Sequence, residues 1–243
     1  MTAIRTTDFL IEVAKGNVPG NSLFSCIARG AASTALRDVW GGSGDLIYPT
    51  TGETWEIVSD NAADTSAGTG ARTVLITSLD ASYVQQTETV TLNGTTAVTL
   101  VNTHFRPVGA QVIDSGSATW NVGELSIQAS GGGNQRSVIG ATQGRAFDGS
   151  FTVPAGKTVL FLQNFILMPK NLSGTVRARF RDSANSNAAW FSTGDLPVYQ
   201  NMLTFPIMAK FPIAEKTDFR SISLLDSGVG EVTVISELLL VDN

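Results

Sequence analysis

Apolar and polar residues alternate with a period close to two along most of this chain. In the first half, four short segments follow this pattern and are bounded by Gly, Asn, Asp or Ser; they cover residues 54–59, 73–78, 87–92 and 97–101. Alternation of this kind is typical of strands that bury one face. Long patterns with a period of 3.6 residues, typical of amphipathic helices, do not occur. The pattern therefore predicts an all-β fold.

The second half contains longer alternating segments. Residues 176–181 place Val, Ala and Phe on one parity and Arg177, Arg179 and Arg181 on the other. Residues 232–240 place Val and Leu on one parity, with Thr and Glu on the other. We expect both segments to be antiparallel strands with one face turned to a core.

Turn residues separate the predicted strands. Asn93-Gly94 lies between two alternating segments, and this dipeptide accepts positive φ at low cost, so it predicts a hairpin with antiparallel neighbours. Pro154 and Gly156 predict a second turn. The apolar residues 159–167 that follow are expected to form a buried central strand.

The most flexible-looking stretch is 131–135, which reads Gly-Gly-Gly-Asn-Gln. Because it is too polar and glycine-rich to pack, we interpret it as a linker between domains. The predicted organisation is an N-terminal arm or attachment segment, 1–40, followed by two antiparallel β-sandwich domains of jelly-roll type, 41–130 and 136–243.

The first 40 residues follow a different pattern. Residues 8–13 resemble a strand, and residues 30–39 suit a short helix or an extended arm, with a first strand of the main body as the alternative. The apolar side chains of Phe9, Leu10 and Ile11 must be buried against other residues, and we expect a neighbouring protein to bury them. We also expect protein contacts at Arg177, Arg179 and Arg181.

Charge and composition exclude some partners. The chain has 16 Lys and Arg against 21 Asp and Glu, a net charge of −5, which leaves no basic surplus for nucleic acid. We find neither a membrane-spanning apolar stretch nor a signal peptide, so no membrane partner is expected. Cys26 is the only cysteine and has no disulfide partner in the chain. Charged residues make up only 15% of the chain, which is consistent with large protein contacts.

Candidate chemistry is sparse. His104 is the only histidine, and no nucleophile motif surrounds it. Asp60 and Asp64 offer oxygen ligands for calcium but lack the spaced ligand set of a known loop. The glycine-rich residues 68–72 lack the ending of a phosphate loop and are expected to form a turn. We therefore expect no enzyme activity, cofactor or metal.

A glycan-binding or glycan-hydrolysing module remains as the alternative. A glycosidase needs two nearby carboxylates, for which the candidates are Asp114, Glu124, Asp148 and Asp195. A sugar site needs exposed aromatic rings, for which the candidates are Trp40, Trp55, Trp120 and Trp190, although tryptophan in a sandwich is more often buried. The arginine stripe suits either an acidic partner or a solvated strand face.

Several tracts resemble a known family. Residues 8–20, DFLIEVAKGNVPG, are similar to the opening of uncharacterised virion structural proteins of tailed bacteriophages. Residues 63–73, 90–95, 152–158 and 240–243 resemble later tracts of the same proteins. The resemblance spans nearly the whole chain, but its motifs are mostly turns.

This resemblance implies a β-rich, non-enzymatic particle component, such as a capsid decoration, a neck or collar protein, or a base for tail fibres. Its implied partners are copies of itself in a symmetric homo-oligomer and other virion proteins. Its implied location is the virion, assembled in the cytoplasm of the host bacterium. Besides the glycan module on a tail, a free cellular β-sandwich binder is a third hypothesis.

Overall fold

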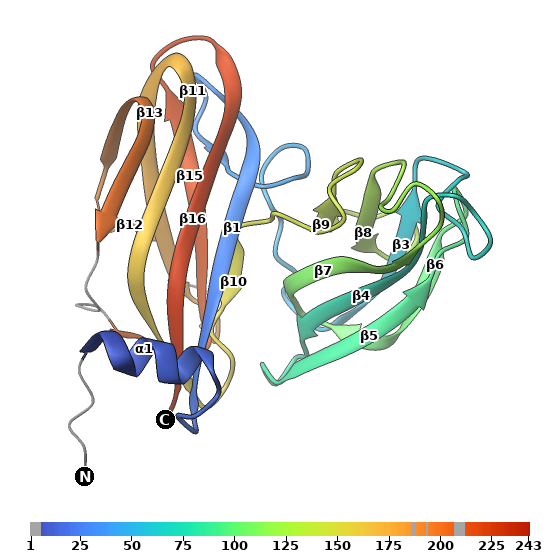
Figure 1. Cartoon of the computed structure of the whole chain (residues 1–243), viewed down its shortest axis with the longest axis horizontal. Coiled ribbons are helices and arrows are strands. Elements are labelled where there is room, and N and C mark those ends of the chain that lie inside the picture. Colours follow the sequence, from blue (N-terminus) through green and yellow to red (C-terminus); the bar gives the residue numbers. More distant parts are fainter. Residues whose placement is uncertain (1–5, 186–187, 193, 207–211) are drawn as a thin grey trace.

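The structure is a computed structural model that describes residues 6–185, 188–192, 194–206 and 212–243. Within these ranges the chain forms antiparallel sheets and a single nine-residue helix, α1 (Thr6–Ala14). The all-β prediction is confirmed. The strands group into two bodies that lie side by side in Figure 1. We call β3 to β9 the small body, and α1, β1, β2 and β10 to β16 the large body.

The small body contains two sheets that share one core. One sheet has the order β6-β3-β8-β9, with β3 (Glu53–Ser59), β6 (Val98–His104), β8 (Leu125–Ala129) and β9 (Gln135–Ile139). The other has the order β5-β4-β7, with β4 (Ala71–Leu79), β5 (Gln85–Thr91) and β7 (Arg106–Ser115). Trp55 and Ile57 of the first sheet are fully buried and cluster with Val74 and Ile76 of the second. The predicted strands in this region are therefore confirmed.

The large body is built on one nine-stranded sheet. Its main path is β1 (Asn21–Ser33), β16 (Val229–Asp242), β11 (Lys157–Asp182), β15 (Thr217–Leu225) and β10 (Ser150–Thr152). The short strand β2 (Arg37–Asp38) pairs with β15, while β12 (Phe191–Ser192), β13 (Leu196–Pro206) and β14 (Pro212–Ile213) pair with β11. The predicted central strand, residues 159–167, lies in β11 between β16 on one side and β13 and β14 on the other.

Strand β11 folds back on itself. Its first half pairs with β16 and its second half with β15, and the register of its pairing with β13 shifts between Met168 and Ser173. Asn171 has φ of 70° inside this bend, a conformation that Asn tolerates better than most residues. The rings of Phe161 and Phe180 are 6.0 Å apart, whereas 19 residues of straight strand would span about 60 Å. The two halves of β11 therefore face each other across one core.

The arginine alternation is confirmed in this second half. Val176 and Phe180 are buried, and the Phe180 ring packs 5.4 Å from Phe219 of β15. Residues 232–240 of β16 likewise turn Val232 and Leu238 into the core.

The N-terminal prediction of a strand over residues 8–13 is wrong, because Thr6–Ala14 is helical. Val13 is buried, and Phe9, one turn earlier, is partly buried on the same helix face. Gly16, with φ of 76°, ends the helix and donates to the Val13 carbonyl at 2.9 Å. In a segment of only six residues, periodicity alone does not separate helix from strand.

Two turns join different elements from those predicted. Gly94 has the expected positive φ, but β5 pairs with β4 and β6 pairs with β3, so Asn93-Gly94 joins two sheets rather than two hairpin strands. The amide of Gly94 donates to the Asp64 carbonyl at 2.8 Å, which fixes this turn to a neighbouring loop. The segment 131–135 is not a linker, because β8 and β9 on either side pair with each other. Gly131 and Gly132 have positive φ, as a tight turn requires.

The small body is inserted into the sequence of the large one. Strand β1 pairs along its full length with β16, so residues 21–33 belong to the large sheet and do not form an arm. The chain crosses between the bodies twice, through residues 39–52 and 140–149. The predicted boundary at 131–135 therefore lies within the small body.

Candidate functional site

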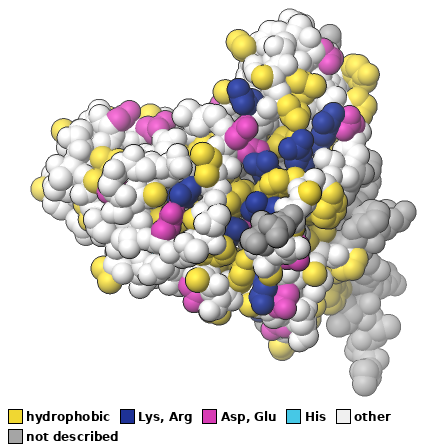
Figure 2. Space-filling model, turned by 180° about the vertical axis from the view of Figure 1, so that it is seen from behind, with side chains coloured by type: hydrophobic (Ala, Val, Ile, Leu, Met, Phe, Trp, Pro, Cys, Tyr) yellow, Lys and Arg dark blue, Asp and Glu magenta, His cyan; other side chains and the backbone are white. Residues whose placement is uncertain are grey.

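The three predicted arginines lie on the outer face of β11, and the structure gives each a different environment. Arg177 donates from Nη2 to Asp195 Oδ2 at 3.0 Å. Arg179 lies directly opposite Arg220 of β15, a pairing of like charges that is unfavourable on its own. Arg181 donates to Asp218. Figure 2 shows the molecule from behind, with several Lys and Arg side chains gathered beside hydrophobic ones.

A buried ion pair joins the two bodies. Arg106, the first residue of β7, donates from Nε to Asp218 Oδ1 of β15 at 2.9 Å, and both side chains are almost fully buried. The remaining Arg106 donors reach the Pro49 carbonyl at 2.8 Å and the Ser183 hydroxyl at 2.7 Å. Thr152 donates to Asp218 at 2.7 Å. Every charge in this network has a partner, which is what allows it to be buried.

Aromatic rings surround these guanidinium groups. The Arg106 Cζ atom is 4.9 Å from the centre of the Tyr48 ring, and that of Arg181 is 5.4 Å from the same ring. Trp190 packs against Arg181 at 4.6 Å and against Arg220 at 4.2 Å. These distances are within the range of cation–π contacts.

A groove of about 650 Å³ opens beside this network. We call it the interbody groove, because residues from both bodies and from the first crossing segment form its walls. Its lining consists of residues 48–52, 81–83, 105–106, Arg181, 183–185 and Lys216. Within the described residues, the interbody groove brings cations, aromatic rings and hydroxyl groups together around an open space.

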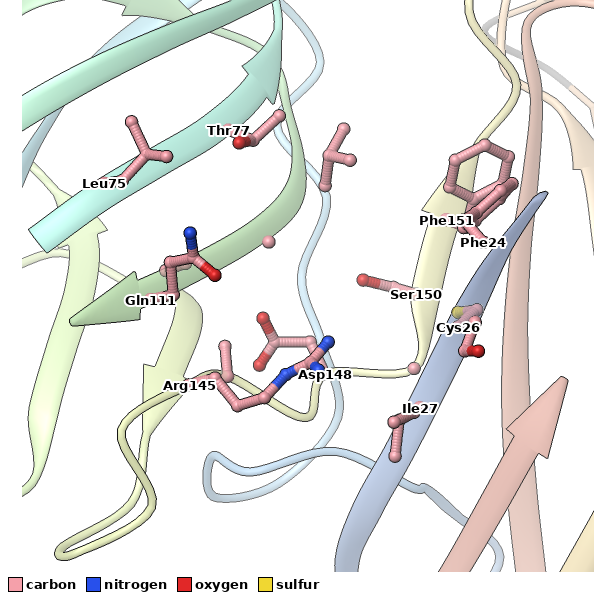
Figure 3. A pocket seen from close by; sticks show the side chains of 16 residues that line it. Phe24, Cys26, Ile27, Leu75, Thr77, Gln111, Arg145, Asp148, Ser150 and Phe151 are labelled. Atoms are coloured by element: carbon pink, nitrogen blue, oxygen red, sulfur yellow. The ribbon is translucent and has the colours of Figure 1, made fainter. Parts of the chain in front are cut away.

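A second, smaller cavity of about 210 Å³ lies between the bodies, and Figure 3 shows its walls. Leu75, Thr77 and Gln111 come from the small body, opposite Cys26 of β1 in the large body. Asp148 of the second crossing segment also lines it.

Burial alters the acidity of two groups in this cavity. Burial raises the pKa of Asp148 to about 6, although it accepts hydrogen bonds from the Ser137 hydroxyl and the Val138 amide. Burial also raises the pKa of the Cys26 thiol to about 12, so the thiol is protonated and a poor nucleophile at neutral pH.

His104 belongs to a buried polar cluster. Its Nδ1 lies 2.7 Å from the Ser78 hydroxyl and its Nε2 lies 3.4 Å from a Glu88 carboxylate oxygen, which resembles a nucleophile–histidine–acid arrangement. However, Ser78 is fully buried and the imidazole stacks on Trp55 with ring centres 4.8 Å apart. Burial lowers the pKa of His104, against the opposing effect of Glu88. A substrate cannot reach this serine in the structure described.

The two calcium candidates stabilise loops. Asp64 is fully buried and accepts hydrogen bonds from the amides of Ala71, Val122 and Gly123 at 2.7–2.8 Å. Asp60 accepts from the Glu124 amide at 2.9 Å. Among the described residues no group of three or more His, Cys, Asp or Glu is arranged to hold a metal ion. The oxygens of Asp64 are thus occupied by backbone donors.

The remaining candidate carboxylates do not gather in one cleft. Asp114 is exposed on β7, Glu124 precedes β8, and Asp195 pairs with Arg177 on the large body. None of them lines the interbody groove.

The tryptophans divide between core and surface. Trp40 and Trp55 are buried, Trp190 is partly buried against the arginines, and Trp120 is half exposed. Of the predicted N-terminal contact residues, Phe9 and Leu10 are partly buried, and Ile11 is 51% exposed.

No helix in the described part of the chain is long and apolar enough to span a membrane.

Comparisons with known proteins give no family. No family model matches the chain, and no curated protein matches it. Among solved structures, one similarity is to the structure of infectious bursal disease virus, Gx strain, with 8% sequence identity over 92% of this chain and 73% of that chain. Its TM-score is 0.21, which is too low to establish a common fold.

Proposed function

We propose that this protein is a non-enzymatic structural component of a tailed-phage virion and assembles through protein–protein contacts. The observation that carries the proposal is an outward-facing apolar surface on β11 and β13. It consists of Leu167, Tyr199 and Met202, with Tyr199 76% and Met202 60% exposed. Exposed aromatic and methionine side chains are enriched at protein interfaces. The proposed assignment to a phage particle rests on the resemblance of the sequence tracts to phage virion proteins.

The finer fold assignment belongs to the same proposal. We infer that both bodies are β-sandwiches of jelly-roll type, because sheets or strand halves share a core in each. In the small body the two sheets contribute to one buried cluster, and in the large body the halves of β11 contact through Phe161 and Phe180. Sandwiches of this type present flat faces that suit rings and trimers.

The proposed partners are copies of the chain and other virion proteins. The apolar surface gives the first contact, and the exposed Ile11 of α1 gives a second. Burying each large side chain contributes about 1.5–3 kcal/mol, so several together stabilise a symmetric oligomer.

The test is the oligomeric state of the purified chain, measured by sedimentation at micromolar concentration. We expect an oligomer for the full-length chain and a shift toward monomer for the double variant Tyr199→Ser, Met202→Ser. The matched control is Val101→Ser, since Val101 is also an exposed apolar strand residue but lies on β6 of the small body. If the unaltered chain is monomeric, free self-assembly is wrong. If the control dissociates equally, the surface is misassigned.

A second experiment tests the contribution of the N-terminus. Removing residues 1–20 takes away α1 and leaves β1 complete. We expect weaker assembly with an unchanged circular dichroism signal of the sheets. Loss of the sheet signal would mean that α1 is needed for the fold of its own large body.

A further inference from the structure

The interbody groove has the size and position of a small-molecule site. Its volume of about 650 Å³ lies within the range of about 300–1,000 Å³ found for ligand pockets. In the small body its walls come from the loop between β4 and β5 and from the start of β7. The other walls come from the first crossing segment, from the end of β11 with the residues after it, and from Lys216 before β15. A junction between two bodies is a common place for such sites.

The charge of the lining favours an anion. Arg106, Arg181 and Lys216 line the groove, and no carboxylate does. Asp218 below it neutralises one of these three positive charges, so two remain. The neighbouring carboxylates are turned to backbone amides: Asp182 accepts from Ala184 and Glu215 accepts from Gly156.

Two of the cations that line the groove have donors that no described protein atom accepts from, although the Arg181 Nε among them is itself buried. The Nε of Arg181 has no hydrogen-bond acceptor among the described residues. Lys216 has no ion pair within the described chain, and its Nζ lies 5.9 Å from the centre of the Tyr83 ring. Both Lys216 and Tyr83 have positive φ, 60° and 64°. Such backbone conformations are costly for residues other than glycine, and they concentrate at functional sites.

The uncharged part of the lining suits a sugar. Tyr48, Tyr83 and Phe105 supply aromatic rings, against which the C–H face of a pyranose packs. Thr50 and Ser82 supply hydroxyl groups that both donate and accept, as sugar hydroxyls require. A carboxylate on the sugar would meet the ammonium and guanidinium donors as charge-assisted hydrogen bonds.

We propose that the interbody groove binds a carboxylate-bearing sugar, with the carboxylate at Lys216 and Arg181 and the ring against the tyrosines. This site is independent of self-assembly and goes beyond the proposed structural function. It supplies a way for a particle component to recognise an acidic glycan.

The experiment is saturation-transfer NMR and calorimetry on the full-length chain with three probes: D-glucuronate, D-glucose and acetate. We expect glucuronate to bind more tightly than either of the others, because only it offers both the ring and the charge. Equal binding of acetate would overturn the sugar assignment. Equal binding of glucose would overturn the role of the cations, and no binding of any probe would overturn the site.

Variants locate the binding to the groove. Lys216→Met removes one cation and should weaken glucuronate binding about tenfold, whereas Lys170→Met, at an exposed lysine in the bend of β11, should leave it unchanged. Because Lys216 has a strained backbone, a second variant guards against misfolding. Ala184→Glu adds a carboxylate at an exposed position of the lining and should abolish binding with an unchanged melting temperature. Binding that survives both variants would refute the proposal.

Discussion

Asp148 should make the stability of the chain depend on pH in an unusual direction. Its carboxyl lies in the smaller cavity between the bodies, where burial raises its pKa from 3.8 to about 6. Because the folded state holds this proton more tightly than the unfolded state, the contribution is fully present below pH 3.8. It is lost as the pH rises through 6.

The size of this contribution follows from the shift. About two pKa units correspond to about 3 kcal/mol, of which about 2 kcal/mol is lost between pH 4.5 and 7.5. Asp148→Asn replaces the carboxyl with a group of the same shape that does not titrate. The amide oxygen accepts from the Val138 amide, and the Ser137 hydroxyl can rotate to accept from the new NH₂ group.

Urea unfolding followed by circular dichroism at several pH values measures the effect. The unfolding free energy of the unaltered chain, minus that of Asp148→Asn, should fall by about 2 kcal/mol between pH 4.5 and 7.5. Asp114→Asn, at an exposed carboxylate of β7, controls for the loss of one charge. A difference that stays constant over this range, or that rises with pH, would refute the reasoning.

Three further predictions concern the fold. Arg106→Met leaves Asp218 buried without its main partner and should lower the free energy of unfolding in urea by about 3–5 kcal/mol. The control Arg29→Met breaks an exposed ion pair with Glu231 and should lower it by under about 1 kcal/mol. Similar losses for the two variants would mean that the buried pair is unimportant. Asp64→Ala removes the acceptor of three backbone amides and should cost about 3 kcal/mol or more, and a loss below about 1 kcal/mol in the same assay would contradict this. Far-UV circular dichroism should show mainly strand, and a helix content near the globular average of about 30% would be incompatible with a single nine-residue helix in the described chain.

The sequence was informative where one face of a strand meets a core. The prediction that Val176 and Phe180 face the core is correct, because burial of one face of a strand imposes a period of two on its sequence. The sequence was least informative at turns. The glycines at 94 and 131 indicated turns, and both have positive φ, but the sequence did not show which strands these turns join. The partner of a strand depends on the whole sheet, which local chemistry does not encode.

The candidate site was harder to predict than the strands. Arg181 was identified from its alternation, but its partner Asp218 is 37 residues away in sequence, and Arg106, which shares that partner, is 75 residues away. Nothing in the local pattern around Arg106 distinguishes it from a surface arginine. Asp64 was only a weak candidate for a calcium ligand, and the sequence did not reveal that its carboxylate accepts hydrogen bonds from the amides of Val122 and Gly123, about 60 residues away.

The pairing of β1 with β16 determines when the large body is able to fold. Asn21 of β1 lies opposite Val241 of β16. During synthesis β1 therefore stays unpaired until about 220 more residues have left the ribosome. The small body has no such delay, because its strands all lie between Glu53 and Ile139. It is able to form during synthesis while β1 remains unpaired, and contacts of such long sequence separation are slow to form. Until the last strand arrives, β1 carries an open edge on which a second nascent chain competes with β16.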